Sequence, residues 1–148
     1  MTQDKTSQKN LLLLSNTTNA GGKPLEHAVE EMRSILGGRK TVTFIPYAAP
    51  DVISLNEAHG LYEACFRRME PVFKEMGYLL QMSPHPLDMA DRIGRAEAFY
   101  VAGGNTWELL HRLKEYGLMR PIREPTNKGD PYIGSSAGSV LEGLTIGN

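Results

Sequence analysis

The sequence predicts an α/β fold: a doubly wound, mostly parallel sheet with helices on both faces. Short apolar or β-branched runs alternate with amphipathic segments of helical length, and loops rich in glycine and polar residues follow several of these runs directly. No internal repeat or low-complexity segment interrupts the alternation. Strands that alternate with helices in this way pair in parallel, because each helix carries the chain back along the sheet.

The first elements follow from simple patterns. Residues 1–10 are polar, and we expect them to form a disordered lead-in to one domain over 11–148. The run 11–14 is four leucines, which is typical of a central strand buried on both faces. Apolar residues then recur at helical spacing after Pro24, up to Gly37 and Gly38, and predict a helix.

The remaining elements are predicted in the same way. Residues 41–45 are β-branched or aromatic and stop at a proline, which predicts a second strand. A long helix is expected over about 56–76, kinked or split at Pro71. The further expected strands are 78–82, 98–102 and the run before Gly134, with helices starting at Trp107 and around 118–124.

Bulk composition narrows the class of partner. The 148 residues carry 41% hydrophobic residues and a formal net charge of −1, which suits one ordinary core and gives no basic stripe for nucleic acid or a membrane surface. Cys65 is the single cysteine, so no internal disulfide or thiolate zinc site can form. We therefore expect a cytoplasmic protein that takes a small substrate and needs no metal or cofactor.

The stretch Gly134-Ser135-Ser136-Ala137-Gly138 matches Gly-x-Ser-x-Gly and predicts a nucleophile elbow centred on Ser136. A serine on a tight strand-to-helix turn is strained, and the two flanking glycines remove Cβ atoms that would collide. The turn exposes the hydroxyl and points the Ala137 N–H toward a developing oxyanion. A flexible Gly/Ser connector is the alternative, but apolar residues on both sides argue against it.

A second loop, Gly103-Gly104-Asn105-Thr106, falls between a predicted strand and helix, so it should share the carboxyl edge of the sheet with Ser136. Glycines without side chains can approach a substrate and offer N–H groups to an oxyanion. Asn105 followed by Glu108 also matches a helix capping box, and the glycine pair alone could be a tight turn or a weak phosphate cradle. Ser15 and Asn16 follow a strand end and are candidates to line the pocket.

With both loops in view, the chain resembles the peptidase E group of the S51 serine peptidase family, the aspartyl dipeptidases. The matching blocks are 11–16 with 25–28, 44–48, 103–107 with 109–110, and 132–138. The resemblance implies a fold similar to the class I glutamine amidotransferase core and hydrolysis of dipeptides with an N-terminal aspartate. It implies Ser136 as nucleophile, with the Gly104 region and the Ala137 N–H as oxyanion donors.

The chain departs from the family at Ser135, where a tryptophan is usual, and at Ala102, where a third glycine is frequent. These departures affect the expected pocket shape more than the chemistry. The family's triad acid and histidine follow the elbow, and the sequence reaches Asn148 before either position. We therefore expect the 148-residue chain to be inactive, with an exposed apolar edge beside the elbow strand and marginal stability or self-association.

Substitutes for the missing base and acid are weak candidates. His27 and His111 are expected within helices, so only His59 and His85, nearer loops, are worth mutating. Asp51 follows a strand end, whereas three other aspartates are typical of turns or caps: Asp88, Asp91 and Asp130. Two alternatives to the dipeptidase stay open, namely a non-catalytic module that binds a peptide or an anion, and a cyanophycinase-like S51 peptidase.

Overall fold

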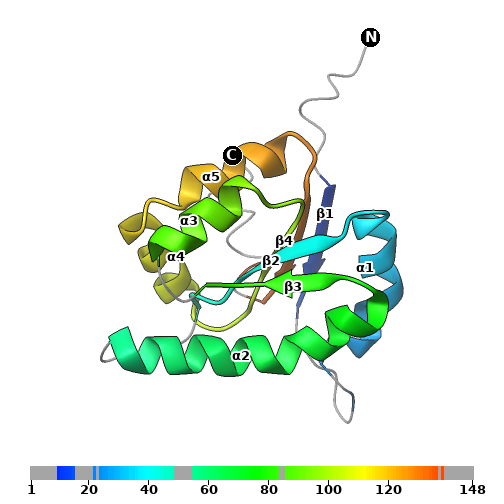
Figure 1. Ribbon diagram of the computed structural model, residues 1–148, viewed down its shortest axis with the longest axis horizontal. Coiled ribbons are helices and arrows are strands. Elements are labelled where there is room, and N and C mark those ends of the chain that lie inside the picture. Colours follow the sequence, from blue (N-terminus) through cyan, green and yellow to red (C-terminus); the bar gives the residue numbers. More distant parts are fainter. Residues whose placement is uncertain are drawn as a thin grey trace.

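The computed structural model describes residues 10–15, 22, 24–48, 55–83, 86–136 and 138 (Figure 1). Its strands are β1 Asn10–Leu14, β2 Thr41–Ile45, β3 Leu79–Gln81, β4 Phe99–Val101 and β5 Pro131–Ser135. Its helices are α1 Val29–Leu36, α2 Leu55–Met76, α3 Pro86–Gly94, α4 Thr106–Glu115 and α5 Met119–Asn127, with a 3-10 turn, Glu26–Ala28, before α1. Every strand pair is parallel, and the strand order is β1-β5-β4-β2-β3. The predicted fold class is confirmed.

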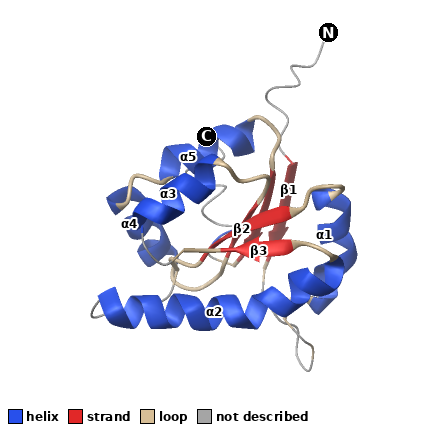
Figure 2. Cartoon of the chain, viewed as in Figure 1, coloured by secondary structure: helices blue, strands red, loops and turns tan. Residues whose placement is uncertain are grey.

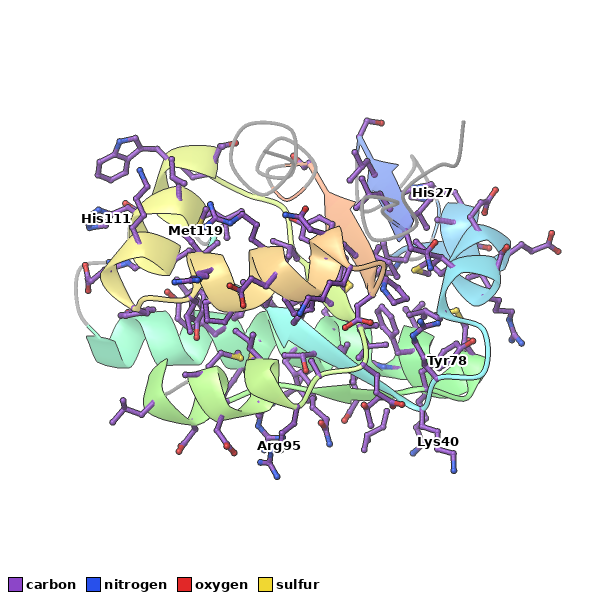
Figure 3. All side chains as sticks on the ribbon, turned by 90° about the horizontal axis from the view of Figure 1, so that it is seen from above. His27, Lys40, Tyr78, Arg95, His111 and Met119 are labelled. Atoms are coloured by element: carbon purple, nitrogen blue, oxygen red, sulfur yellow. The ribbon has the colours of Figure 1, made fainter. Side chains whose placement is uncertain are left out.

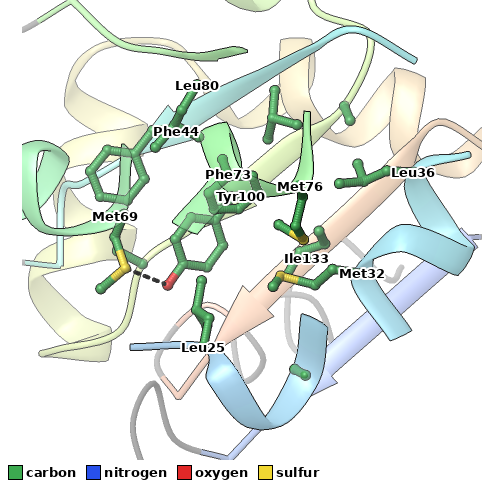
Figure 4. Close-up of a cluster of buried hydrophobic side chains, with 14 residues drawn as sticks. Leu25, Met32, Leu36, Phe44, Met69, Phe73, Met76, Leu80, Tyr100 and Ile133 are labelled. Carbon is green, nitrogen blue, oxygen red and sulfur yellow. Dashed lines mark hydrogen bonds between the residues drawn. The ribbon is translucent and has the colours of Figure 1, made fainter. Parts of the chain in front are cut away.

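Helices cover both faces of the sheet (Figure 2). Alternate residues of each strand point to opposite faces. In β4, Phe99 and Val101 therefore pack with α3, α4 and α5, whereas Tyr100 packs with α1 and the C-terminal part of α2. Figure 4 shows this second cluster, in which the Tyr100 ring stacks on Phe44 at 5.4 Å between centroids. Two buried clusters hold the strand ends in fixed positions.

The strand β1 does not lie where its sequence predicts. Among the described strands it is the outermost, and β5 lies inside the sheet between β1 and β4. Leu13 is 43% exposed. The run of leucines correctly indicates a strand with apolar neighbours, but strand order depends on long-range pairing that the run does not encode. Among the described strands the elbow strand is therefore not at the edge where an exposed apolar face was expected.

One helix prediction needs correction, and a second is decided between its two alternatives. The expected helix after Pro24 begins later, because Leu25 is buried with a left-handed φ of 59° and only a 3-10 turn follows before α1. The long helix α2 continues through Pro71 and is not split there. Its last turns are inclined to the rest of α2 in Figure 1, as expected where a proline removes an intrahelical hydrogen bond.

The amino-terminal ends of β2 and β4 are joined by one carboxylate. Glu97 Oε1 accepts hydrogen bonds from the Lys40 N–H at 3.1 Å, and from the Thr41 N–H and hydroxyl, both at 2.9 Å. These donors hold the pKa of Glu97 below its ordinary value, with the Thr41 hydroxyl as the largest cause. The contact fixes the position of β4, which leads into the glycine loop of the site, relative to its neighbour β2.

Candidate active site

Ser136 occupies the turn that ends β5, and its backbone is in the left-handed region at a φ of 52°. A residue with a side chain pays about 1–3 kcal/mol for this conformation, so surrounding contacts must impose it. One of these contacts is the Ser136 N–H, which donates to the carbonyl of Leu14 at 2.7 Å. The turn has the backbone strain that a nucleophile elbow requires, and the chain is already helical at Gly138.

Only glycine fits at position 138, because β4 lies too close to leave room for a side chain. A Cβ at this position would lie 2.4 Å from the carbonyl oxygen of Val101 on β4. The sequence predicted that the glycine prevents a collision within the elbow itself; the described collision is instead with β4. The consequence is that the chain after Ser136 packs directly against the strand that leads into the second loop.

The second loop touches the elbow. A Cβ on Gly103 would lie 2.8 Å from the Cβ of Ser136 and 3.0 Å from the carbonyl oxygen of Ser135. Gly104 has a φ of 142°, and a Cβ there would lie 2.3 Å from the carbonyl oxygen of Ala48. Side chains at either position would separate loops that now meet, so the two motifs predicted to share one edge of the sheet are in direct contact.

The backbone N–H groups of this loop divide into two kinds. Ala102 donates to the Ile45 carbonyl at 3.0 Å, and Asn105 donates to the Ala48 carbonyl at 2.7 Å. Between them, the N–H groups of Gly103 and Gly104 have no acceptor in the part of the chain that the structure describes. Two unused donors beside a strained serine are suited to an oxyanion. Ala137, the other predicted donor, lies outside the described residues.

Asn105 serves as a helix cap. Its Oδ1 accepts from the Glu108 N–H at 3.0 Å and its backbone is extended, as an N-cap requires. The reciprocal half of the predicted capping box does not form, because the Asn105 N–H bonds Ala48 and the Glu108 carboxylate lies 3.6 Å from Arg112. The side chain of Asn105 is therefore engaged in holding the first turn of α4.

Ser15 lies at the same edge of the sheet as Ser136. It directly follows Leu14, which pairs with Ser135 in the β1–β5 ladder, and its side chain is exposed. Its position is compatible with the pocket-lining role predicted for it. Asn16, the second predicted lining residue, lies outside the described residues.

The two departures from the family pattern lie in the interior. Ser135 is fully buried, and its hydroxyl lies 3.2 Å from the hydroxyl of Tyr100. Ala102 is 8% exposed and belongs to the cluster on the same face. Their side chains therefore contribute to packing beneath the elbow. The hydroxyl pair was missed by sequence reasoning, because an aromatic residue in a buried strand looks like any other core residue.

Neither histidine with a described side chain reaches Ser136 by a hydrogen bond. His111 lies 3.3 Å from Glu115 and stacks on Trp107 with ring centroids 5.0 Å apart. His27 is half-buried beside β1, at the opposite end of the molecule from His111 (Figure 3), and its Nδ1 has no partner among the described residues. The side chain of His59 and the whole of His85 lie outside the described part.

The described acidic and thiol groups do not form a second catalytic centre. Asp88 lies in the first turn of α3 and accepts a hydrogen bond from Ser83 at 3.4 Å, which fits its predicted turn or cap role. Asp91 lies inside α3 and pairs with Arg95, so the turn or cap role predicted for it is wrong. Burial raises the pKa of the Cys65 thiol, which disfavours its reactive thiolate. Within the described residues, no three His, Cys, Asp or Glu side chains are grouped as a metal site.

Cavity size does not locate the site. A cavity of about 480 Å³ lies between α3 and α5 and is lined in part by Ala96 and Asp130. These two residues precede β4 and β5, at the amino ends of the strands. In parallel α/β sheets ligands bind at the carboxyl ends, where Ser136 and Gly103 lie. We therefore place the candidate site at the contact of the two loops.

Comparisons with known proteins match almost the whole chain. The family description "Peptidase family S51" fits residues 11–148. Peptidase E of Nostoc sp. strain PCC 7120 is 39% identical over 139 residues, which is 93% of this chain and 54% of that protein. Peptidase E of Escherichia coli O6:K15:H31 is 36% identical over 136 residues, covering 92% and 56%. The chain thus spans about half the length of these relatives.

Solved structures show the same fold. A structure from Listeria monocytogenes EGD-e, provisionally designated peptidase E, superposes with a TM-score of 0.65 at 28% identity, covering 90% of this chain and 61% of that one. A peptidase from an acI-B1 actinobacterium gives 0.65 at 21% identity, covering 89% and 55%. With the elbow, the glycine loop and the sheet order in place, the sequence match has a structural basis, and the chain belongs to peptidase family S51.

Proposed function

We propose that this chain carries the nucleophile half of a serine-type dipeptidase that hydrolyses dipeptides with an N-terminal aspartate. The observation that supports it best is the contact between the two loops: strained Ser136 lies against Gly103, in a loop whose Gly103 and Gly104 N–H groups have no acceptor among the described residues. The relatives named peptidase E support the reaction class. The preference for aspartate rests on the resemblance alone.

In the proposed reaction, the Ser136 hydroxyl oxygen attacks the carbonyl carbon of the peptide bond. The Gly103 and Gly104 N–H groups donate to the oxygen that becomes negatively charged, which stabilises the tetrahedral intermediate. The serine proton passes to a base and then to the leaving amine, the C–N bond breaks, and an ester to Ser136 is formed. Water hydrolyses the ester and restores the hydroxyl.

The base is the unassigned part of this mechanism. Strand order ranks the histidines: His27 follows β1 and His111 lies in α4 after β4, both strands next to β5, whereas His59 lies in the helix after β2, two strands away. His111 is engaged by Glu115 and Trp107, which makes it the control. At about 4.8 Å per strand, β2 lies some 10 Å from the elbow strand and β3 some 14 Å. Alanine at His27, His59 or His85 tests each in turn, with His111→Ala as the matched control.

The central test is Ser136→Ala, with exposed Ser34→Ala as its control. Because the base and acid are unassigned within the 148 residues, this test and the activity tests below use a full-length form of the protein that supplies both. There, hydrolysis of aspartyl dipeptides, followed by chromatography, should be lost in the first variant and retained in the second. Undiminished turnover in Ser136→Ala would refute the nucleophile. A panel that includes other aspartyl peptides separates the dipeptidase from a cyanophycinase-like enzyme.

A non-catalytic peptide-binding or anion-binding module is the second candidate. Its supporting observation is the same pair of free N–H groups, which can hold a carboxylate as well as an oxyanion. Calorimetry with aspartyl dipeptides should then show binding in the wild type and in Ser136→Ala, without hydrolysis in either. Absence of heat at millimolar ligand would count against this candidate.

No helix of the described residues is long and apolar enough to cross a membrane. The cytoplasmic location inferred from the cysteine content stays a prediction.

A further inference from the structure

The strained turn at Ser136 is spanned by a side-chain hydrogen bond. The hydroxyl of Tyr132 donates to the carbonyl oxygen of Gly138 at 2.6 Å. Tyr132 lies four residues before Ser136 and Gly138 two residues after it, so the bond closes a loop around the serine. The distance is within the normal range for a hydroxyl donor, and both residues are buried.

The two ends of this bond are constrained by different contacts. Tyr132 is fully buried in the cluster beneath α3, α4 and α5, and its backbone pairs with Phe99 on β4. Gly138 lies against Val101, where even a methyl group would come within 2.4 Å of the carbonyl oxygen. Packing fixes Tyr132, whereas the contact with Val101 only limits how closely Gly138 can approach β4. The hydroxyl bond therefore holds the chain in place as it leaves the serine.

The hydrogen bond between the hydroxyls of Ser135 and Tyr100, on the other face of β5, does not span the serine turn. Ser135 and Tyr100 meet 3.2 Å apart, before the turn begins. That contact can hold the end of the strand, but it does not cross Ser136. Within the described residues, the bond from Tyr132 is the side-chain contact that joins the strand before the serine to the chain after it.

We propose that Tyr132 is a positioning residue, which holds Ser136 in its left-handed conformation through the hydrogen bond to the Gly138 carbonyl. The proposal rests on the role of Ser136 as nucleophile given above. Loss of the hydroxyl would let the turn relax toward an unstrained φ and move the serine oxygen away from the N–H groups of Gly103 and Gly104. A shift of about 1 Å at a reacting atom can lower a rate on the order of a hundredfold.

The test compares Tyr132→Phe with Tyr62→Phe. Tyr62 is 1% exposed and its hydroxyl has no partner among the described residues, so the control removes a buried hydroxyl without breaking a bond. With aspartyl dipeptides, we expect kcat to fall at least about tenfold in Tyr132→Phe while KM changes less than twofold, and neither to change in Tyr62→Phe.

A second readout does not depend on activity. The Ser136 N–H, bonded to Leu14 at 2.7 Å, reports the turn directly by hydrogen exchange in NMR. Under conditions that strongly favour the native state, its exchange should accelerate at least about tenfold in Tyr132→Phe, while amides of β2 exchange as in the wild type. A role in global stability alone would accelerate both.

The outcomes separate the two proposals. If the wild type hydrolyses no dipeptide, the proposed function fails, and the exchange of the Ser136 amide still decides the role of Tyr132. If Tyr132→Phe matches Tyr62→Phe in kcat and in this exchange rate, the positioning role is wrong. Should Tyr132→Phe not fold, 4-aminophenylalanine at this position keeps a weaker donor; intermediate values of both quantities support the role, and wild-type values overturn it.

Discussion

The sharpest test of the site is Gly103→Ala, because the added atom has one well-defined obstacle. The new Cβ would lie 2.8 Å from the Cβ of Ser136. Favourable carbon–carbon separations begin near 3.5 Å, so the two atoms must move apart by about 0.7 Å. The carbonyl oxygen of Ser135, 3.0 Å away, blocks a sideways escape. The φ of Gly103 is not in the left-handed region, so the expected effect is purely steric.

Two magnitudes follow from this displacement. Overpacking of a well-filled site costs about 1–3 kcal/mol of unfolding free energy. A nucleophile moved by about 0.7 Å should lose on the order of 10- to 100-fold in kcat if Ser136 acts as proposed. Gly38→Ala is the matched control, since a Cβ there meets nothing within 4 Å and its φ is not left-handed. That change should be neutral or stabilise by up to about 1 kcal/mol.

The assay combines urea unfolding, dipeptide hydrolysis and labelling of Ser136 by a fluorophosphonate. Gly103→Ala should be less stable than Gly38→Ala and should label more slowly. Equal stability of the two variants, together with wild-type kcat for Gly103→Ala, would show that the loops do not touch. A loss of stability with full kcat would mean that the loops touch but that Ser136 is not the reacting group.

Three further predictions follow from described contacts. A double-mutant cycle of Ser135→Ala and Tyr100→Phe should give a coupling of about 0.5–1.5 kcal/mol in urea unfolding, and zero coupling would contradict their hydrogen bond. Asn105→Ala should cost about 1 kcal/mol by loss of the cap, whereas Asn105→Asp should keep the stability; a loss of hydrolysis in Asn105→Asp alone would reveal a role in the site. The lowered pKa of Glu97 contributes stability above its unfolded pKa near 4.5, and this is lost as pH falls through the folded value. Glu97→Gln should flatten that part of the stability profile between pH 3 and 7, and an unchanged slope would rule out the assignment.

Much of the fold is legible in the sequence because it depends on local periodicity. The alternation of apolar runs with amphipathic segments predicts every described strand to within about two residues at each end, and the glycine pairs and prolines near their ends mark the loops. The order of the strands across the sheet, in contrast, does not depend on local periodicity. The run 11–14 has the composition of a central strand, yet β1 lies at the edge of the described sheet, because partner choice is decided by residues more than 100 positions away.

The residues of the candidate site likewise fall into those that local motifs predict and those that depend on contacts between distant residues. Ser136, Gly103 and Gly104 are predictable because short motifs encode strained or close-packed backbone. Tyr132 is not, since its hydroxyl reaches a carbonyl six residues on and no motif records that. The base is also not predictable, because a histidine is recognised by its distance from the serine and not by its neighbours in the chain.

Three glycines explain why the two loops meet where they do. A Cβ at Gly103 would strike the side chain of Ser136, one at Gly104 the Ala48 carbonyl, and one at Gly138 the Val101 carbonyl. Packing alone does not call for this arrangement, because an interior is normally filled by side chains and backbone segments rarely approach so closely. In the proposed mechanism, this close approach instead brings backbone N–H donors to the half-buried Ser136, where a tetrahedral oxygen would form. The cost in strain at Ser136 is then a property of the site, and a variant that relaxes the strain should gain stability as it loses turnover.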